Sequence, residues 1–150
     1  MEHKTTTVNT ADLTGAALDW AVAVAVEVWK DAHEWFPTMT LDPSFSGVQP
    51  MVYSDGQAAC QLIPNNPFRQ DYQIYSPSTD WSQGGPLIEQ YGVDLYHSSG
   101  DYWSATTGDM VWEVECGDNQ SIGPTPLIAA CRAIVEAKLG DTVDVPEVLV

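Results

Sequence analysis

The chain has 150 residues, a length that suits one ordinary domain with a substantial buried core. Hydrophobic residues make up 44% and aromatic residues 10%, a composition that excludes an intrinsically disordered chain. Five Lys or Arg stand against 21 Asp or Glu, so the formal net charge is -16 and the pI is about 4.1. Such a field repels nucleic-acid phosphates and anionic membranes and attracts basic protein surfaces or metal ions. We therefore expect no direct nucleic-acid binding, although solubility alone is a sufficient reason for an acidic surface.

The cysteines and the N-terminus indicate the compartment. Cys60, Cys116 and Cys131 are far apart and show no CxxC or Cys/His spacing, which favours free thiols in a reducing environment. The opening residues, MEHKTTTVNT, are too polar for a signal peptide. The longest apolar run, Ala21–Val26, is far shorter than the roughly 20 residues that cross a bilayer. We expect a cytoplasmic protein without a membrane segment.

The first third of the chain predicts one helix between irregular segments. Residues 1–9 are polar, and we expect them to be flexible. A helix is predicted to open at Thr10-Ala-Asp-Leu-Thr-Gly and to run to about His33, because apolar residues recur there at helical spacing. Pro37 then stops this helix.

Residues 37–72 are interrupted by prolines and glycines and indicate an irregular insertion. Within it, only Gln49–Tyr53 and Ala58–Ile63 have the pattern of short strands. The turn residues Ser54-Asp55-Gly56 join them, so the simplest interpretation is a hairpin with ragged flanks.

A short strand at Gln73–Tyr75 precedes the stretch SPSTDWSQGGPLIEQYG, in which the glycines and Pro86 predict a helix start. That short helix is expected to end at Tyr91, before Gly92. Three strands separated by tight turns follow, and an antiparallel meander is their simplest arrangement. They are predicted at Val93–His97, Tyr102–Thr107 and Met110–Cys116.

The last helix has clear start and stop signals. Thr125 suits the N-cap, Pro126 suits the first helical position and Gly140 closes the helix. The order of elements predicts a single α+β domain. In it, the three-strand meander and the irregular hairpin form a small antiparallel sheet, with the two longer helices packed on one face.

Catalytic and metal-binding signals are weak. His97 stands beside Ser98 and Ser99 with Asp94 three residues before it, which allows a hydrolase hypothesis but is a common arrangement in random sequence. Glu113 and Glu115 project from one face of a predicted strand without a clustered His or Cys. No P-loop, GxGxxG or HExxH pattern occurs, so we expect no cofactor, no bound metal and no catalytic residues.

The two glycine-proline helix starts, near Gly84–Pro86 and Gly123–Thr125, offer a different kind of site. A helix N-terminus presents unpaired N–H groups and a partial positive charge that can hold a phosphate or carboxylate, and a Trp can stack on a base. The alternative is ordinary helix capping, with Trp81 in the core. The candidate ligand-binding residues are Ser78, Thr79, Asp80, Trp81, Ser82, Gln83, Gly84, Gly85, Trp103, Gly123, Thr125 and Arg132.

Three blocks of sequence resemble the NinX-like family of small proteins encoded by tailed phages and prophages. They are LTGAALDWAVAVA (Leu13–Ala25), YSPSTDWSQGGPLIE (Tyr75–Glu89) and GPTPLIAACRAIVEAKLGDTVDVP (Gly123–Pro146), and they appear in the family's order. The resemblance implies a phage-derived accessory protein of the host cytoplasm. It supplies no activity and no catalytic residues.

Three functions remain open at this point. The first is a non-enzymatic binding protein that modulates host functions such as antiphage defence, by sequestering a small anionic or nucleotide ligand or by occupying a host protein. The second is an acidic inhibitor that imitates nucleic acid and blocks a basic host protein. It requires carboxylates that gather on one face with regular spacing, such as Asp42, Asp55, Asp71, Glu113, Glu115, Asp141, Asp144 and Glu147. The third is a small hydrolase that uses His97. Apolar helices and an exposed sheet edge also favour a homo-oligomer under any of the three.

Overall fold

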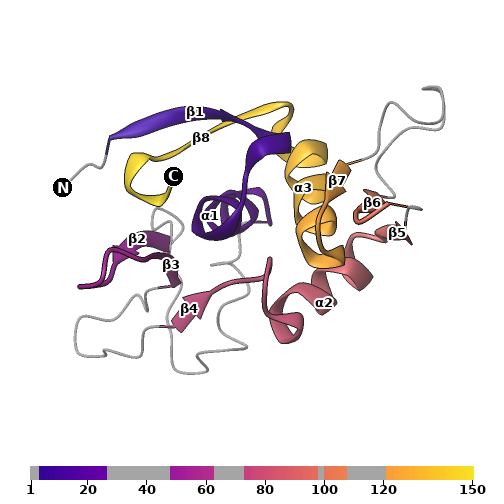
Figure 1. Ribbon diagram of the computed structural model, residues 1–150, viewed down its shortest axis with the longest axis horizontal. Coiled ribbons are helices and arrows are strands. Elements are labelled where there is room, and N and C mark those ends of the chain that lie inside the picture. Colours follow the sequence, from indigo (N-terminus) through magenta and orange to yellow (C-terminus); the bar gives the residue numbers. More distant parts are fainter. Residues whose placement is uncertain (1–3, 27–47, 63–72, 98–99, 108–120) are drawn as a thin grey trace.

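The computed structural model describes residues 4–26, 48–62, 73–97, 100–107 and 121–150 (Figure 1). Within these residues the fold is α+β, as predicted, with three α-helices and small antiparallel sheets. In chain order the elements are β1 (Thr5–Asn9), the 3-10 turn η1 (Thr10–Asp12), α1 (Gly15–Val26), β2 (Val48–Val52), β3 (Ala58–Leu62), β4 (Gln73–Tyr75), α2 (Trp81–Gln90), β5 (Asp94–His97), β6 (Trp103–Thr106), β7 (Ser121–Gly123), α3 (Pro126–Leu139), β8 (Thr142–Pro146) and the 3-10 turn η4 (Glu147–Leu149).

The described strands form three separate sheets around a central helix pair. We call them the terminal ribbon (β1-β8), the hairpin sheet (β2-β3-β4) and the meander sheet (β5-β6-β7). Helices α1 and α3 pack against each other, with the hairpin sheet against α1 and the meander sheet against α3 (Figure 1). The predicted hairpin and meander therefore belong to different sheets. Each long helix is apolar on more than one side, so each is covered by a separate sheet.

The N-terminal residues differ from the expected flexible segment. Thr5–Asn9 form β1, which pairs antiparallel with β8 so that Val8 lies opposite Val143. The valines of β8 point inward while alternate threonines of β1 remain exposed, the period-2 pattern of a half-buried strand. Burial of these valines over the helices offsets the entropy of ordering the terminus.

Helix α1 begins at Gly15, the last residue of the predicted opening stretch, and Thr10–Asp12 form η1 before it. Thr10 is buried in η1, where its hydroxyl donates to the Gly140 carbonyl at 2.6 Å and its N–H donates to the Asp141 carbonyl at 2.8 Å. Thr10 therefore joins the two ends of the fold instead of capping α1. The helix is described to Val26, and its predicted end near His33 lies outside the described residues.

The hairpin is confirmed, with β2 and β3 paired antiparallel across a turn at residues 53–57. Gly56 has φ of 90°, a conformation that favours glycine. Strand β4, also predicted, pairs with β3 and places Cys60 opposite Tyr75. The rest of the predicted insertion, residues 37–47 and 63–72, lies outside the described residues.

The first two strands of the predicted meander are confirmed as β5 and β6, which pair antiparallel. The predicted third strand, Met110–Cys116, lies outside the described residues. The partner on the far side of β6 is β7, a short strand that the sequence pattern did not indicate. Because β7 leads directly into α3, the meander sheet is tied to the start of that helix.

Helix α2 begins at Trp81, so the predicted start at Pro86 is wrong. The Asp80 carboxylate accepts the Ser82 N–H at 2.9 Å and the Ser82 hydroxyl at 2.6 Å, which makes Asp80 the N-cap. Gly84 and Pro86 lie inside the helix. The predicted stop at Gly92 agrees with the structure, where this glycine has φ of 59° just after the helix.

Helix α3 has the predicted signals in their predicted places. The Thr125 hydroxyl accepts the Ile128 N–H at 3.1 Å, and Pro126 is the first helical residue. Gly140 ends the helix with φ of 93°, and its N–H donates to the Glu136 carbonyl at 3.0 Å. Local signals sufficed here because no distant segment competes for this helix start.

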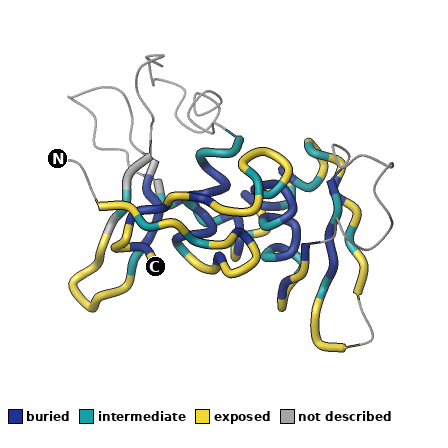
Figure 2. Tube along the Cα trace, turned by 90° about the horizontal axis from the view of Figure 1, so that it is seen from above, coloured by how far each residue is buried: buried dark blue, intermediate teal, exposed yellow. Residues whose placement is uncertain are grey.

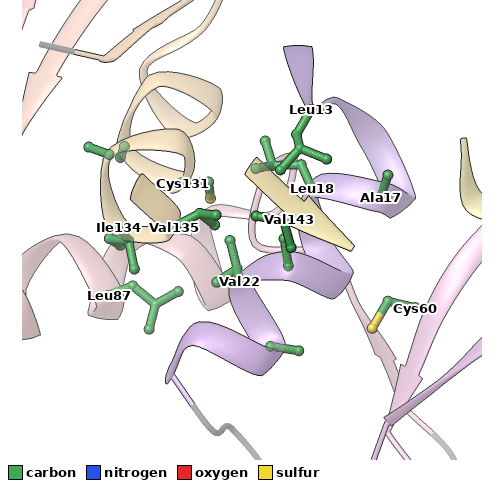
Figure 3. Packing of buried hydrophobic residues seen from close by; sticks show 14 of the residues in the cluster. Leu13, Ala17, Leu18, Val22, Cys60, Leu87, Cys131, Ile134, Val135 and Val143 are labelled. Carbon is green, nitrogen blue, oxygen red and sulfur yellow. The ribbon is translucent and has the colours of Figure 1, made fainter. Parts of the chain in front are cut away.

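The core lies where the helices meet. Buried residues gather in the centre of the molecule, while the hairpin ends are exposed (Figure 2). Leu18 and Val22 of α1 pack with Ile134 and Val135 of α3, and Leu87 of α2 joins them (Figure 3). All but Leu87 are at most 1% exposed, so this contact supplies much of the hydrophobic stabilisation.

Gly84 permits the close approach of α2 to this core, and its substitution tests the packing. A Cβ on Gly84 would overlap the Pro77 carbonyl oxygen and lie 2.7 Å from Cδ2 of Leu127. We expect Gly84→Ala to lower the free energy of unfolding by about 2–4 kcal/mol in urea denaturation. Gly85→Ala is the matched control, because its Cβ would meet only Cε3 of Trp81, at 3.9 Å. That variant should be neutral or slightly stabilised. Equal stability of the two variants would contradict the packing of α2.

Candidate functional site

One carboxylate is buried at the centre of the described structure. Asp19 is the one charged residue of α1 and is 5% exposed. Its Oδ1 accepts the backbone N–H of Ser78 at 2.9 Å, a bond between residues 59 positions apart. Burial raises the pKa of Asp19 to about 6, and the hydrogen bond from the Ser78 backbone N–H opposes this shift. The carboxylate therefore fixes the turn before α2 against helix α1.

Three other buried titratable groups surround this carboxylate. Burial raises the pKa of the Cys60 and Cys131 thiols, and the charge of Asp19 raises both further. Burial likewise raises the pKa of Tyr75, and the two cysteines and Asp19 add to the shift. Cys131 comes from α3 and Cys60 from β3, on different sides of α1 (Figure 3). These thiols stay protonated at neutral pH, so they are core residues and not nucleophiles.

The polar residues of the stretch 76–83 are engaged within the protein. The Gln83 amide accepts the Ser76 N–H at 2.6 Å and donates to the Ile74 carbonyl at 3.0 Å. Ser78 is buried beside Asp19, whereas Thr79 is exposed. Gln83 therefore connects β4 to α2. Backbone N–H groups of this turn hold the turn in place, whereas the buried Ser78 hydroxyl has no hydrogen-bond partner within the described residues.

The start of α2 is already occupied by a negative charge. The Asp80 carboxylate takes the Ser82 N–H, and the Asp80 carbonyl takes those of Gln83 at 3.1 Å and Gly84 at 2.8 Å. An anion at this helix start would meet a carboxylate instead of free N–H groups. Trp81 is 56% exposed, so the alternative that placed it in the core is excluded.

The start of α3 offers few free donors. Pro126 has no N–H, and the N–H groups of Ile128 and Ala129 donate to the hydroxyl and the carbonyl of Thr125. Gly123 is buried against α3, where a Cβ would lie 2.7 Å from the Ala129 nitrogen. Its lack of a side chain serves close packing of β7 on the helix.

Arg132, the predicted cation of the ligand site, also has a structural role. Its Nε donates to the Leu13 carbonyl at 2.9 Å, and a second guanidinium nitrogen donates to the Ile122 carbonyl at 2.6 Å. Burial lowers the pKa of this guanidinium, and the carboxylate of Asp12 opposes the shift. Arg132 thus connects the start of α1, helix α3 and strand β7.

Trp103 lies in a different place from the other predicted ligand residues. It pairs in register with His97 on β5 and with Gly123 on β7. The rings of His97 and Trp103 are 4.8 Å apart between centroids. The structure therefore brings together two of the predicted ligand residues, Trp103 and Gly123. Trp81, the other predicted aromatic residue, lies on α2 and not on this sheet.

The hydrolase hypothesis is not supported by the geometry of β5. Asp94 and His97 are three residues apart on one strand, so their side chains project to opposite faces. Ser98 and Ser99 lie outside the described residues. Among the residues that the structure describes, no group of three or more His, Cys, Asp or Glu could hold a metal ion. Nor is any described helix both long and apolar enough to span a bilayer.

Asp19 was absent from the predicted site, although the sequence contains a signal for it. A single carboxylate within an otherwise apolar helix that is covered on several sides must be buried or must interrupt a packed face. A buried Asp19 carboxylate needs a hydrogen-bond donor, but the sequence around Asp19 does not indicate that Ser78 supplies it.

The described fold defines a small α+β protein in which buried hydrogen bonds join segments far apart in the chain. The family model described as bacteriophage P22, NinX, matches residues 9–138, and the chain belongs to this family of phage proteins. This match confirms the family that the three sequence blocks indicated. No curated protein matches the chain.

The three family-like blocks meet in space. Asp19 of the first block accepts from Ser78 of the second, and Arg132 of the third donates to Leu13 of the first. Gly84 of the second block approaches Leu127 of the third. The motifs that identify the family are thus the contacts that hold α1, α2 and α3 together.

The raised pKa of Asp19 makes stability depend on pH. The unfolded carboxyl binds its proton near pH 3.8 and the folded one near 6, so the folded state holds this proton more tightly. The protonated Asp19 carboxyl therefore stabilises the folded state most below pH 3.8, and this stabilisation is lost as pH rises through 6. Relative to Asp19→Asn, which keeps an oxygen acceptor for Ser78, wild type should gain up to about 3 kcal/mol between about pH 7 and about pH 4. Chemical denaturation across this range measures the difference, with exposed Glu89→Gln as the charge control. A constant difference would contradict the buried carboxylate.

The structural role of Arg132 is tested by its removal. Arg132→Gln should lower the free energy of unfolding by about 1–3 kcal/mol, because two carbonyls lose a charged donor. Lys138→Gln is the comparison on the same helix, since Lys138 is exposed. It should change stability by less than about 0.5 kcal/mol. Thermal and urea unfolding measure both variants. Unchanged stability in Arg132→Gln would contradict the structural role of Arg132 and leave its guanidinium as a candidate for ligand binding.

Proposed function

We propose that this phage protein is a non-enzymatic binding protein that acts in the host cytoplasm and modulates a host function such as antiphage defence. Its partner is a basic host protein, attracted by a surface of almost one sign of charge. This choice among the predicted partners rests on how the few basic residues are used.

The observation that carries the proposal is the engagement of two of the three described cations, Arg132 and Lys138, whereas Lys4 is exposed just before β1. Arg132 donates to two backbone carbonyls, and the Lys138 ammonium lies 5.3 Å from the centre of the Tyr91 ring. Carboxylates, by contrast, are spread over the exposed surface. Those exposed in the described residues are Asp12, Asp55, Glu89, Asp94, Asp101, Asp141, Asp144 and Glu147. A field of this kind accelerates encounter with a basic surface and disfavours acidic partners.

Imitation of nucleic acid receives less support. Of the carboxylates that this hypothesis needs on one face, Asp55 lies in the β2–β3 turn, Asp141 directly precedes β8 and Asp144 lies on β8. Asp42, Asp71, Glu113 and Glu115 are outside the described residues, and Glu147 follows β8 in η4. Alternate residues of an extended segment project to opposite faces, so Asp141 and Asp144, three residues apart, do not share one face. The described carboxylates match a general attraction to positive charge better than phosphate spacing.

A small anion or nucleotide is also less well supported. Both predicted helix starts use most of their N–H groups internally, and Asp80 adds a negative charge at the first. The nucleotide hypothesis keeps one supporting feature. Trp103, on which a base could stack, lies in register with Gly123 near the start of α3. Small-molecule release is therefore included as an outcome of the experiment.

Affinity capture from phage-infected host cells tests the proposal, with bound proteins and released small molecules analysed in parallel. We expect a host protein of high pI that binds the purified phage protein directly. Its affinity should fall at least about tenfold as salt rises from about 0.05 to 0.5 M, because screening shortens the range of the attraction. Deletion of the phage gene should restore the activity of that host protein during infection. Release of a nucleotide without a protein partner, or turnover of a substrate by the purified protein, would contradict the proposal.

A further inference from the structure

The meander sheet has one face against α3 and one face turned away from it. Leu95, Ala105 and Ser121 share a register row, and α3 packs against this sheet. Ala105 belongs to the core and Leu95 packs against it, so this row lies on the covered face. The neighbouring row consists of Tyr96, Ser104 and Ile122, and in it Ser104 is 5% exposed between two exposed side chains. Because alternate residues of a strand point to opposite faces, this second row lies on the outer face.

Large apolar side chains are exposed on that outer face. Tyr96 is 58% exposed and Ile122 is 51% exposed, on the two edge strands of the sheet. Tyr102, directly before β6, continues the alternation of Ser104 and is 43% exposed. Scattered single hydrophobics are ordinary on a surface, but three on one face of a three-stranded sheet form a patch. Tyrosine is also enriched among the residues that dominate binding energy at protein interfaces.

The charged side chains of the sheet itself are carboxylates, and the Arg132 guanidinium that reaches the Ile122 carbonyl from α3 is hydrogen-bonded within the protein. Asp94 lies on the same face of β5, and Asp101 lies in the β5–β6 connection; both are exposed. The described parts of the sheet and its connections, residues 93–97, 100–107 and 121–123, contain no Lys or Arg. Aromatic rings flanked by carboxylates suit a guanidinium, which stacks on the ring and bonds a carboxylate through two N–H groups. An ammonium lacks both the planar stacking and the paired donors.

We propose that the outer face of the meander sheet, formed by Tyr96, Tyr102, Ile122, Asp94 and Asp101, docks an arginine-bearing segment of the partner protein. This inference rests on the proposed function and specifies its surface. The net charge of -16 selects the occupant. A second copy of the chain carries the same charge and is repelled, and nucleic acid is repelled for the same reason.

The test uses two synthetic peptides of equal charge, octa-arginine and octa-lysine, titrated into the full chain. Binding is followed by the amide signals in NMR and by calorimetry. We expect the arginine peptide to bind more tightly than the lysine peptide and to shift the amides of residues 94–106 and 122 most. Tyr96→Ala and Tyr102→Ala should each lower the affinity for the arginine peptide by about 3- to 10-fold. This is the contribution expected of one contact between a cation and a partly exposed aromatic ring.

Matched controls separate the aromatic face from charge and from folding. Trp81→Ala removes an aromatic ring that is 56% exposed on α2, and it should change the affinity less than twofold. Asp94→Asn should weaken binding more than Glu89→Gln, although each removes one exposed charge. An unchanged amide spectrum away from the substituted residue shows that each variant is folded.

Equal affinity for the two peptides, or unchanged affinity in both tyrosine variants, would overturn the proposal and leave only a general charge attraction. A concentration-dependent dimer abolished by Tyr96→Ala would overturn it in favour of a second copy. If the captured host protein binds both tyrosine variants as well as wild type, the docking face is wrong while the proposed function stands. If neither a basic host protein nor the arginine peptide binds, both fail.

Discussion

The hydrogen bond from the Ser78 backbone N–H to the Asp19 carboxylate is the constraint on which the arrangement of the helices depends. A buried carboxylate is costly unless it is hydrogen-bonded, so α1 tolerates Asp19 because the turn before α2 lies against it. The turn sets where α2 begins, and α2 then places Gly84 against Leu127 of α3. This interaction across 59 residues joins α1 to the turn before α2, while the core and Arg132 hold α1 against α3.

This arrangement separates the residues that define the family from the surface that we propose for binding. The family-like blocks meet at Asp19, Gly84 and Arg132, whose contacts lie within the protein. The meander sheet instead presents tyrosines and carboxylates outward. The contacts that hold the helices together and the surface that we propose for binding therefore lie on different parts of the fold.

Local signals predicted the elements well where no distant segment competes with them. Thr125, Pro126 and Gly140 bound α3 as expected, and the β2–β3 hairpin follows from its turn residues. The start of α2 was misplaced because glycines that serve close packing resemble helix breakers, while Asp80 caps four residues earlier than Gly84. The pairing of β1 with β8 and the contact of Asp19 with Ser78 were not predicted. Both join segments remote in sequence, for which a single sequence carries no local signal.

The burial of the Asp19 carboxylate against Ser78 can be observed through its titration. An NMR titration can follow the side-chain carboxyl carbon of Asp19 and the amide of Ser78 in the same sample. We expect both signals to change together with a midpoint at about pH 6, well above the ordinary value of 3.8. A midpoint near 3.8, with a Ser78 amide that does not respond, would contradict the buried contact and the helix arrangement built on it.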